Sequence, residues 1–227
     1  MAEDDPSGHA PDMATPEPCR EEETLLGRLS EVRSNLDRER AEAPELVAEL
    51  LASPDERRVE RLQRETCYHT WGVCELLLAR SIEATDAAEA ERLAILTLEG
   101  TDRLDPAHHA AAVVKDLQAR AWAVAGDARR RRGDLTTAEE ALRAAAACLA
   151  DGTGDLLVEA RLLEFEASLR REQGRIGEAA ALLKMAAARY RETGETQLLE
   201  RVLAERDSIL RREGSAEPHR SVVGSIS

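Results

Sequence analysis

The sequence predicts an all-α fold, and three features of its composition support this prediction. Alanine and leucine, which are both strong helix formers, account for 39 and 30 of the 227 residues. Aromatic residues, which favour sheets, are limited to two Trp, two Tyr and one Phe. The chain has no proline between Pro106 and Pro218, so no proline interrupts a helix over that long stretch.

Apolar spacing and capping residues define the helices in order along the chain. The first helix carries leucines and a valine at steps of 4, 3 and 4 residues, namely Leu25, Leu29, Val32 and Leu36. Sequences typical of capping boxes begin three later helices, at Ser53–Glu56, Asp86–Glu89 and Thr136–Glu139, and Asp105-Pro106 begins another. Glycines stand where helix C-caps are expected, at Gly133, Gly174, Gly194 and Gly214. These marks predict helices at 24–41, 44–52, 54–83, 86–100, 106–132, 136–150, 156–173, 177–192 and 196–213.

The composition also divides the chain into four segments. Residues 1–22 are acidic and proline-rich, with few large apolar residues, and we expect them to form a disordered arm. We expect N-terminal helices over 23–53, a helical repeat domain over 54–213, and a flexible tail over 214–227.

The charge and the hydropathy exclude several classes of function. A net charge of −14 argues against general nucleic-acid binding and against attraction to an anionic membrane. The longest uncharged apolar run, at 144–150, is too short to span a bilayer, and the acidic N-terminus does not look like a signal peptide. We therefore expect a cytoplasmic protein, with no cofactor, no nucleic-acid partner and no membrane partner.

An internal repeat is the most informative feature. Four residues recur after a constant offset of 41 positions. The first set is Gly133, Ala138, Leu142 and Ala145, and the second is Gly174, Ala179, Leu183 and Ala186. Trp122 and Gly126 precede the first set, and Ala167 takes the position of Gly126 in the second.

This pattern resembles the tetratricopeptide repeat. Segments 121–146 and 162–187 are similar to it, and the segment that starts at Trp71 is similar more weakly. The resemblance, which extends to the repeat region of bacterial tetratricopeptide regulators, implies a right-handed α–α superhelix. It would contain about three helical hairpins and a capping helix at 196–213.

The resemblance also implies that the first helix of each hairpin lines a concave groove. The groove positions would fall on Arg120, Ala123, Asp127, Arg130, Arg131, Arg161, Glu164, Ser168 and Arg171. We expect these arginines to bind a peptide or a partner helix. The alternative for the run Arg129–Arg132 is that its cations simply stabilise the C-terminus of a helix. The Lys and Asn with which some repeats of this family hold chaperone tails are missing, which makes a chaperone role doubtful.

Other reactive residues favour structural roles. Cys67, His69 and Cys74 could suggest a metal site, but an apolar helix face explains them better, and the adjacent pair His108 and His109 is expected to be solvated. We find no catalytic motif and expect neither an enzyme nor a metal site.

The leading functional hypothesis is a protein–protein interaction module, such as an adaptor in bacterial regulation. Two alternatives remain open. The chain could sense a small ligand or peptide and act on a separate transcription factor, or it could self-associate as a homo-oligomer through the superhelix or through helix 24–41. A further hypothesis is that the acidic arm is autoinhibitory.

Overall fold

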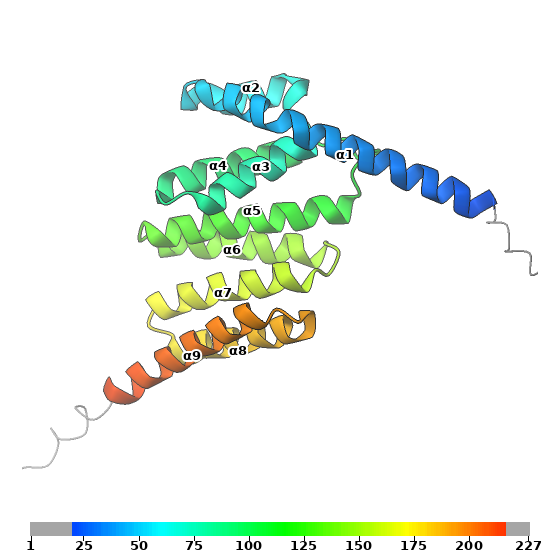
Figure 1. Cartoon of the computed structure of the whole chain (residues 1–227). Coiled ribbons are helices and arrows are strands. Elements are labelled where there is room, and N and C mark those ends of the chain that lie inside the picture. Colours follow the sequence, from blue (N-terminus) through cyan, green and yellow to red (C-terminus); the bar gives the residue numbers. More distant parts are fainter. Residues whose placement is uncertain (1–19, 217–227) are drawn as a thin grey trace, which may run out of the picture. The chain divides into compact units, whose positions relative to one another are not determined.

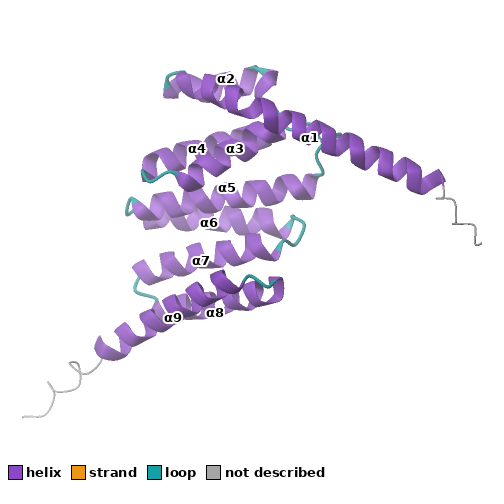
Figure 2. Cartoon of the chain, viewed as in Figure 1, coloured by secondary structure: helices purple, strands orange, loops and turns teal. Residues whose placement is uncertain are grey.

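The computed structural model describes the backbone of residues 20–216 and the side chains of residues 25–212, and every regular element in that range is helical (Figures 1 and 2). The helices are α1 (Arg20–Ala52), α2 (Asp55–Arg64), the short 3₁₀ helix η1 (Thr66–Tyr68), α3 (Trp71–Glu83), α4 (Ala87–Thr101), α5 (Ala111–Arg131), α6 (Leu135–Ala150), α7 (Leu156–Glu172), α8 (Ile176–Thr193) and α9 (Thr196–Ala216). The prediction of an all-α fold is confirmed. The chain divides into two units, Met1–Asn35 and Leu36–Ser227.

Within the larger unit, helices α3 to α9 follow one another in space as they do in sequence (Figure 1). Each of these helices packs against the next, and α3–α5 and α5–α7 also touch directly. Helices α3, α5 and α7 therefore form one row that runs through three consecutive hairpins, and α9 packs on the last of these hairpins through α8.

Small side chains allow the helices to approach closely. Ala138, Leu142 and Ala145 are buried in one cluster, and Ala167, Ala179, Leu183 and Ala186 are buried in the next, as the sequence predicted. A Cβ atom placed on Gly126 would lie 2.9 Å from Leu142 Cδ2, so only glycine fits there without a shift. Trp71 and Trp122 are half-buried and pack against the cluster of α3, α4 and α5.

Helix α1 corrects the predicted separation of 24–41 from 44–52. It runs without a break through Pro44. Proline removes one backbone donor and normally breaks a helix. Here Ala43, Val47 and Leu50 are buried in the hydrophobic core, and this packing offsets the lost hydrogen bond.

The single predicted helix at 54–83 is also wrong, because α2 ends at Arg64 and the chain passes through the 3₁₀ helix η1 before α3 begins at Trp71. The Thr70 side chain accepts a hydrogen bond from Val73 N and starts α3 anew. As a result Cys67 and Cys74 do not share a helix face. Cys74 is buried, as predicted, but Cys67 is exposed.

Several helix ends differ from the predicted ends. Helix α5 begins at Ala111 rather than at residue 106, because Asp105 folds back in a turn and accepts a hydrogen bond from Ala107 N. Asp134, not Thr136, caps α6, and Ser53 does not cap α2. The chain turns with positive φ at Gly133, Gly174 and Gly194 as expected, whereas α9 continues through residue 214 to Ala216.

The predicted arm and tail lie largely outside the described residues. The backbone is described from residue 20, where α1 starts, to residue 216, where α9 ends. No helix in this range is long and apolar enough to cross a membrane.

Candidate interaction groove

A cavity of ≈ 430 Å³ lies along the row formed by α3, α5 and α7. Helix α3 contributes its last turn, and α5 and α7 contribute residues spaced by three or four positions, which place them on one helix face. The α5 residues are Ala119, Arg120, Ala123, Val124, Asp127 and Arg131, and the α7 residues are Val158, Arg161, Leu162 and Phe165. The cavity is thus framed by the first helices of three consecutive hairpins.

Five of the predicted groove residues line this cavity. They are Arg120, Ala123, Asp127, Arg131 and Arg161. The structure brings them together from two helices that are separated in sequence by the whole of α6.

Four other predicted groove residues do not line the cavity. Arg130 is half-buried and forms ion pairs with Asp127 and with Glu172 of α7. Arg171 pairs with Glu205 of α9 at 2.8 Å. Ser168 is half-buried away from the cavity lining.

Glu164 is the fourth predicted groove residue that does not line the cavity. It is buried, with 7% of its surface exposed. Its carboxylate accepts a hydrogen bond from the Tyr190 hydroxyl and another, at 2.7 Å, from Arg201 Nη2. This residue therefore joins α7 to α8 and α9 rather than facing a partner.

The cations of the cavity differ in how they are held. Arg131 Nε lies 3.2 Å from Asp127 Oδ2, and Arg131 Nη1 donates to the Thr85 carbonyl, so this guanidinium is fixed across the end of the cavity. Arg161 is half exposed and lies 3.5 Å from Glu164. Arg120 is exposed and forms no ion pair with any residue that the structure describes. Three arginines therefore face the cavity against a single aspartate.

Apolar side chains complete the lining, and sequence reasoning missed their role. Ile82, at the end of α3, is 54% exposed, although it is a large aliphatic residue. Phe165 lies half-buried on α7. A single sequence does not show that Ile82 lines a cavity, because this depends on how α3 packs on α5.

The arginine run at the end of α5 spreads around the helix. Arg129 and Arg132 both pair with Glu91 of α4, at 2.8 and 2.6 Å, whereas Arg130 and Arg131 pair with Asp127. Only Arg131 reaches the groove, and the rest of the run connects helices.

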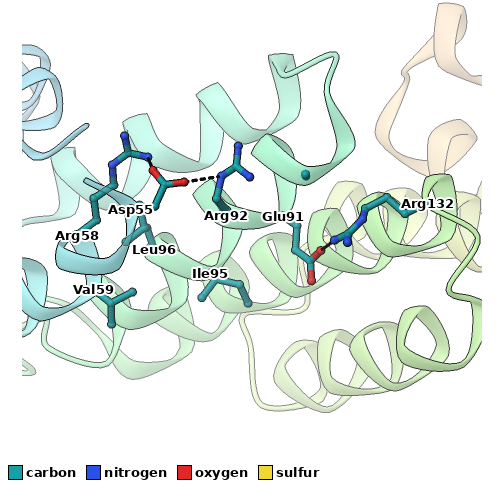
Figure 3. A pocket seen from close by; sticks show the side chains of 9 residues that line it. Asp55, Arg58, Val59, Glu91, Arg92, Ile95, Leu96 and Arg132 are labelled. Carbon is teal, nitrogen blue, oxygen red and sulfur yellow. Dashed lines mark hydrogen bonds and ion pairs between the residues drawn. The ribbon is translucent and has the colours of Figure 1, made fainter. Parts of the chain in front are cut away.

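Arg132 also borders a second cavity of ≈ 330 Å³, between α2 and α4 (Figure 3). Val59, Ile95 and Leu96 form its apolar floor. Its charges are matched within the chain, because Asp55 pairs with Arg58 and Arg92 while Glu91 pairs with Arg132 (Figure 3). The groove on α3, α5 and α7 has the larger excess of cations.

The histidines and cysteines considered as reactive residues lie in surroundings that favour structural roles. His109 stacks on Trp71, with ring centroids 5.8 Å apart, so it is not a solvated neighbour of the exposed His108 as predicted. Burial raises the pKa of the Cys74 thiol, which disfavours the reactive thiolate. Among the described residues, no group of His, Cys, Asp and Glu could hold a metal ion.

No protein-family model, no curated protein sequence and no solved structure matches this chain significantly.

Proposed function

We propose that this chain is a protein-interaction module that binds a segment of a partner protein in the groove along α3, α5 and α7. One observation carries the proposal. A single cavity extends over three consecutive hairpins. The exposed Ile82 lines it together with Arg120, Arg131 and Arg161. A concave, largely apolar lining that also carries arginines is typical of a recognition surface. The proposal includes the expectation that the chain is an adaptor and not an enzyme.

The proposed architecture is a tetratricopeptide-like superhelix. The direct packing of α3 on α5 and of α5 on α7 supports it, because stacked hairpins of this kind place their first helices in one row. Gly133 and Gly174 both have positive φ, 82° and 75°, so the turns of the second and third hairpins have a similar conformation at equivalent positions.

The chemistry of the lining favours a segment that carries both apolar and acidic side chains. An apolar side chain would cover Ile82 and Phe165 and remove their surface from water. Carboxylates would pair with Arg120 and Arg161, and such charge-assisted hydrogen bonds strengthen as water is excluded. Arg131 is already fixed by Asp127 and Thr85, so less side-chain entropy is lost when it binds.

Selection from a library of random peptides, followed by affinity measurement, tests this function. The groove variant is Arg120→Glu with Arg161→Gln, where glutamine avoids placing a second acid beside the buried Glu164. The control is Arg143→Glu with Arg191→Gln, which changes the net charge equally at exposed positions of α6 and α8.

We expect the selected peptides to combine acidic and apolar residues and to lose about tenfold or more in affinity for the groove variant, which corresponds to about 1.4 kcal/mol. The control variant should bind like the wild type. If both variants bind equally well, the groove is not the binding site.

A further inference from the structure

The first half of α1 carries an uncovered apolar row. Leu25, Leu29 and Val32 are 57%, 64% and 48% exposed, although they are large aliphatic residues. Every residue from Leu25 to Asn35 is exposed. Such a helix buries little apolar surface and is marginal in water unless a partner covers it.

The same row becomes hydrophobic core further along the helix. Counting in steps of seven residues from Leu29 gives Leu36, Ala43 and Leu50. Leu36 is half-buried, and Ala43 and Leu50 are 2% and 0% exposed. The seven-residue spacing of the row therefore continues along the sequence into residues that the chain itself covers.

We propose that the uncovered row binds the same row of a second copy of this chain, forming a short coiled coil. Spacing of 4, 3 and 4 residues is the pattern that lets two helices interlock their side chains along a common seam, whereas a globular surface has no need of it. The steps of 4, 3 and 4 residues follow in the same order from either end of the row. Two antiparallel copies thus place Leu25 opposite the second copy's Leu36, and Leu29 opposite its Val32.

Charge favours the antiparallel arrangement. Residues 1–24 contain eight acidic residues and one basic residue, and parallel copies would bring two such segments to the same end. Antiparallel pairing keeps these like charges apart.

Sedimentation equilibrium of the full chain over a range of concentrations tests the pairing. We expect the average mass to rise with concentration from 24.9 kDa toward twice that value. The association should be weak, because the row is shorter than the three to four heptads of a typical coiled coil. The variant Leu29→Glu should remain monomeric.

Ser30→Glu is the matched control, because it adds the same charge to the next exposed residue, off the seam. It should associate like the wild type, and circular dichroism should show that both variants remain helical. A wild-type chain that stays monomeric at its highest soluble concentration overturns the proposal, and so does a Leu29→Glu variant that associates normally.

Disulfide formation tests the orientation in a chain whose Cys19, Cys67 and Cys148 are replaced by serine. Leu25→Cys mixed with Leu36→Cys should form a mixed disulfide. Neither variant alone should crosslink, because identical positions lie about 16 Å apart along antiparallel helices. Crosslinking of each variant alone would show parallel pairing and would overturn the antiparallel arrangement.

Discussion

Tyr68 and Tyr190 are both buried, with 0% and 1% of their surface exposed, but their hydroxyl groups have different surroundings. The Tyr190 hydroxyl donates a hydrogen bond to Glu164. The Tyr68 hydroxyl has no hydrogen-bond partner among the described residues. Burial raises the pKa of Tyr68 to about 12, and burial together with the Glu164 contact raises the pKa of Tyr190. Both phenols therefore stay neutral, and of the two hydroxyl groups only that of Tyr190 makes a hydrogen bond in its buried position.

Replacing each tyrosine with phenylalanine should have different effects on stability. Tyr190→Phe leaves the buried Glu164 carboxylate short of a donor and should lower the free energy of unfolding by about 2 kcal/mol. Tyr68→Phe removes an unpaired polar group and should be neutral or stabilising. Urea unfolding midpoints measure both changes. Equal destabilisation by the two substitutions would contradict this account.

Glu164 shows that the sequence predicts the side of a helix on which a residue lies, but not whether another helix covers it. Spacing along α7 correctly groups Arg161, Glu164, Ser168 and Arg171 near one side of the helix. Spacing does not reveal which neighbouring helix covers which part of that side. Tyr190 and Arg201 come from α8 and α9 and enclose Glu164, while Arg161 remains half exposed.

The start of α3 is held by two acceptors from different parts of the chain. The Thr70 hydroxyl accepts from Val73 N at 3.3 Å, and Glu39 of α1 accepts from Trp71 N at 2.7 Å. Both acceptors satisfy backbone donors that the first turn of a helix leaves unpaired. A Cβ atom on Gly72 would lie 2.3 Å from the Glu39 carbonyl oxygen, so glycine also permits this close approach.

Removing the Thr70 cap tests this description of the element. Thr70→Ala should lower the free energy of unfolding by about 1 kcal/mol, because Val73 N loses its acceptor. Thr66→Ala is the matched control, since Thr66 is exposed and its hydroxyl makes no hydrogen bond in the described part of the chain. Chemical denaturation of both variants provides the measurement, and an equal loss in the control would exclude a capping effect.

Helix ends were harder to predict than helices, for a physical reason. Six of the nine predicted ranges, from 86–100 to 196–213, each correspond to one α-helix, because apolar periodicity extends over many residues. A cap depends on one side chain and its local turn. The range 54–83 contains the Thr70 cap without a break, and the ranges 24–41 and 44–52 are separate although tertiary packing keeps α1 continuous through Pro44.

At the scale of the larger unit, the sequence predicted which small residues pack but not which cavity they leave. Gly126 and Ala138 were identified from the 41-residue offset, and both are buried. The groove depends in addition on Ile82, which lies outside that offset and lines the cavity only because α3 packs on α5. Long-range packing of this kind leaves no periodic trace in a single sequence.

From α2 to α9, the extensive contacts join helices that are neighbours or next-but-one neighbours in sequence. The stability of such an arrangement is close to a sum of local terms. A destabilising substitution at one end should therefore affect mainly the helices at that end. Val202 of α9 and Val47 of α1 offer a matched pair, because both are valines with 0% exposure in different core clusters.

Replacing either valine with alanine should weaken its own end of the stack by about 2 kcal/mol. In hydrogen exchange, Val202→Ala should speed the exchange of amides in α8 and α9 by roughly 30-fold, with α3 and α4 little changed. Val47→Ala should give the reverse pattern, with faster exchange in α3 and little change in α8. A uniform loss of protection in both variants would mean that the helices unfold as one cooperative unit, which the neighbour-to-neighbour contacts argue against.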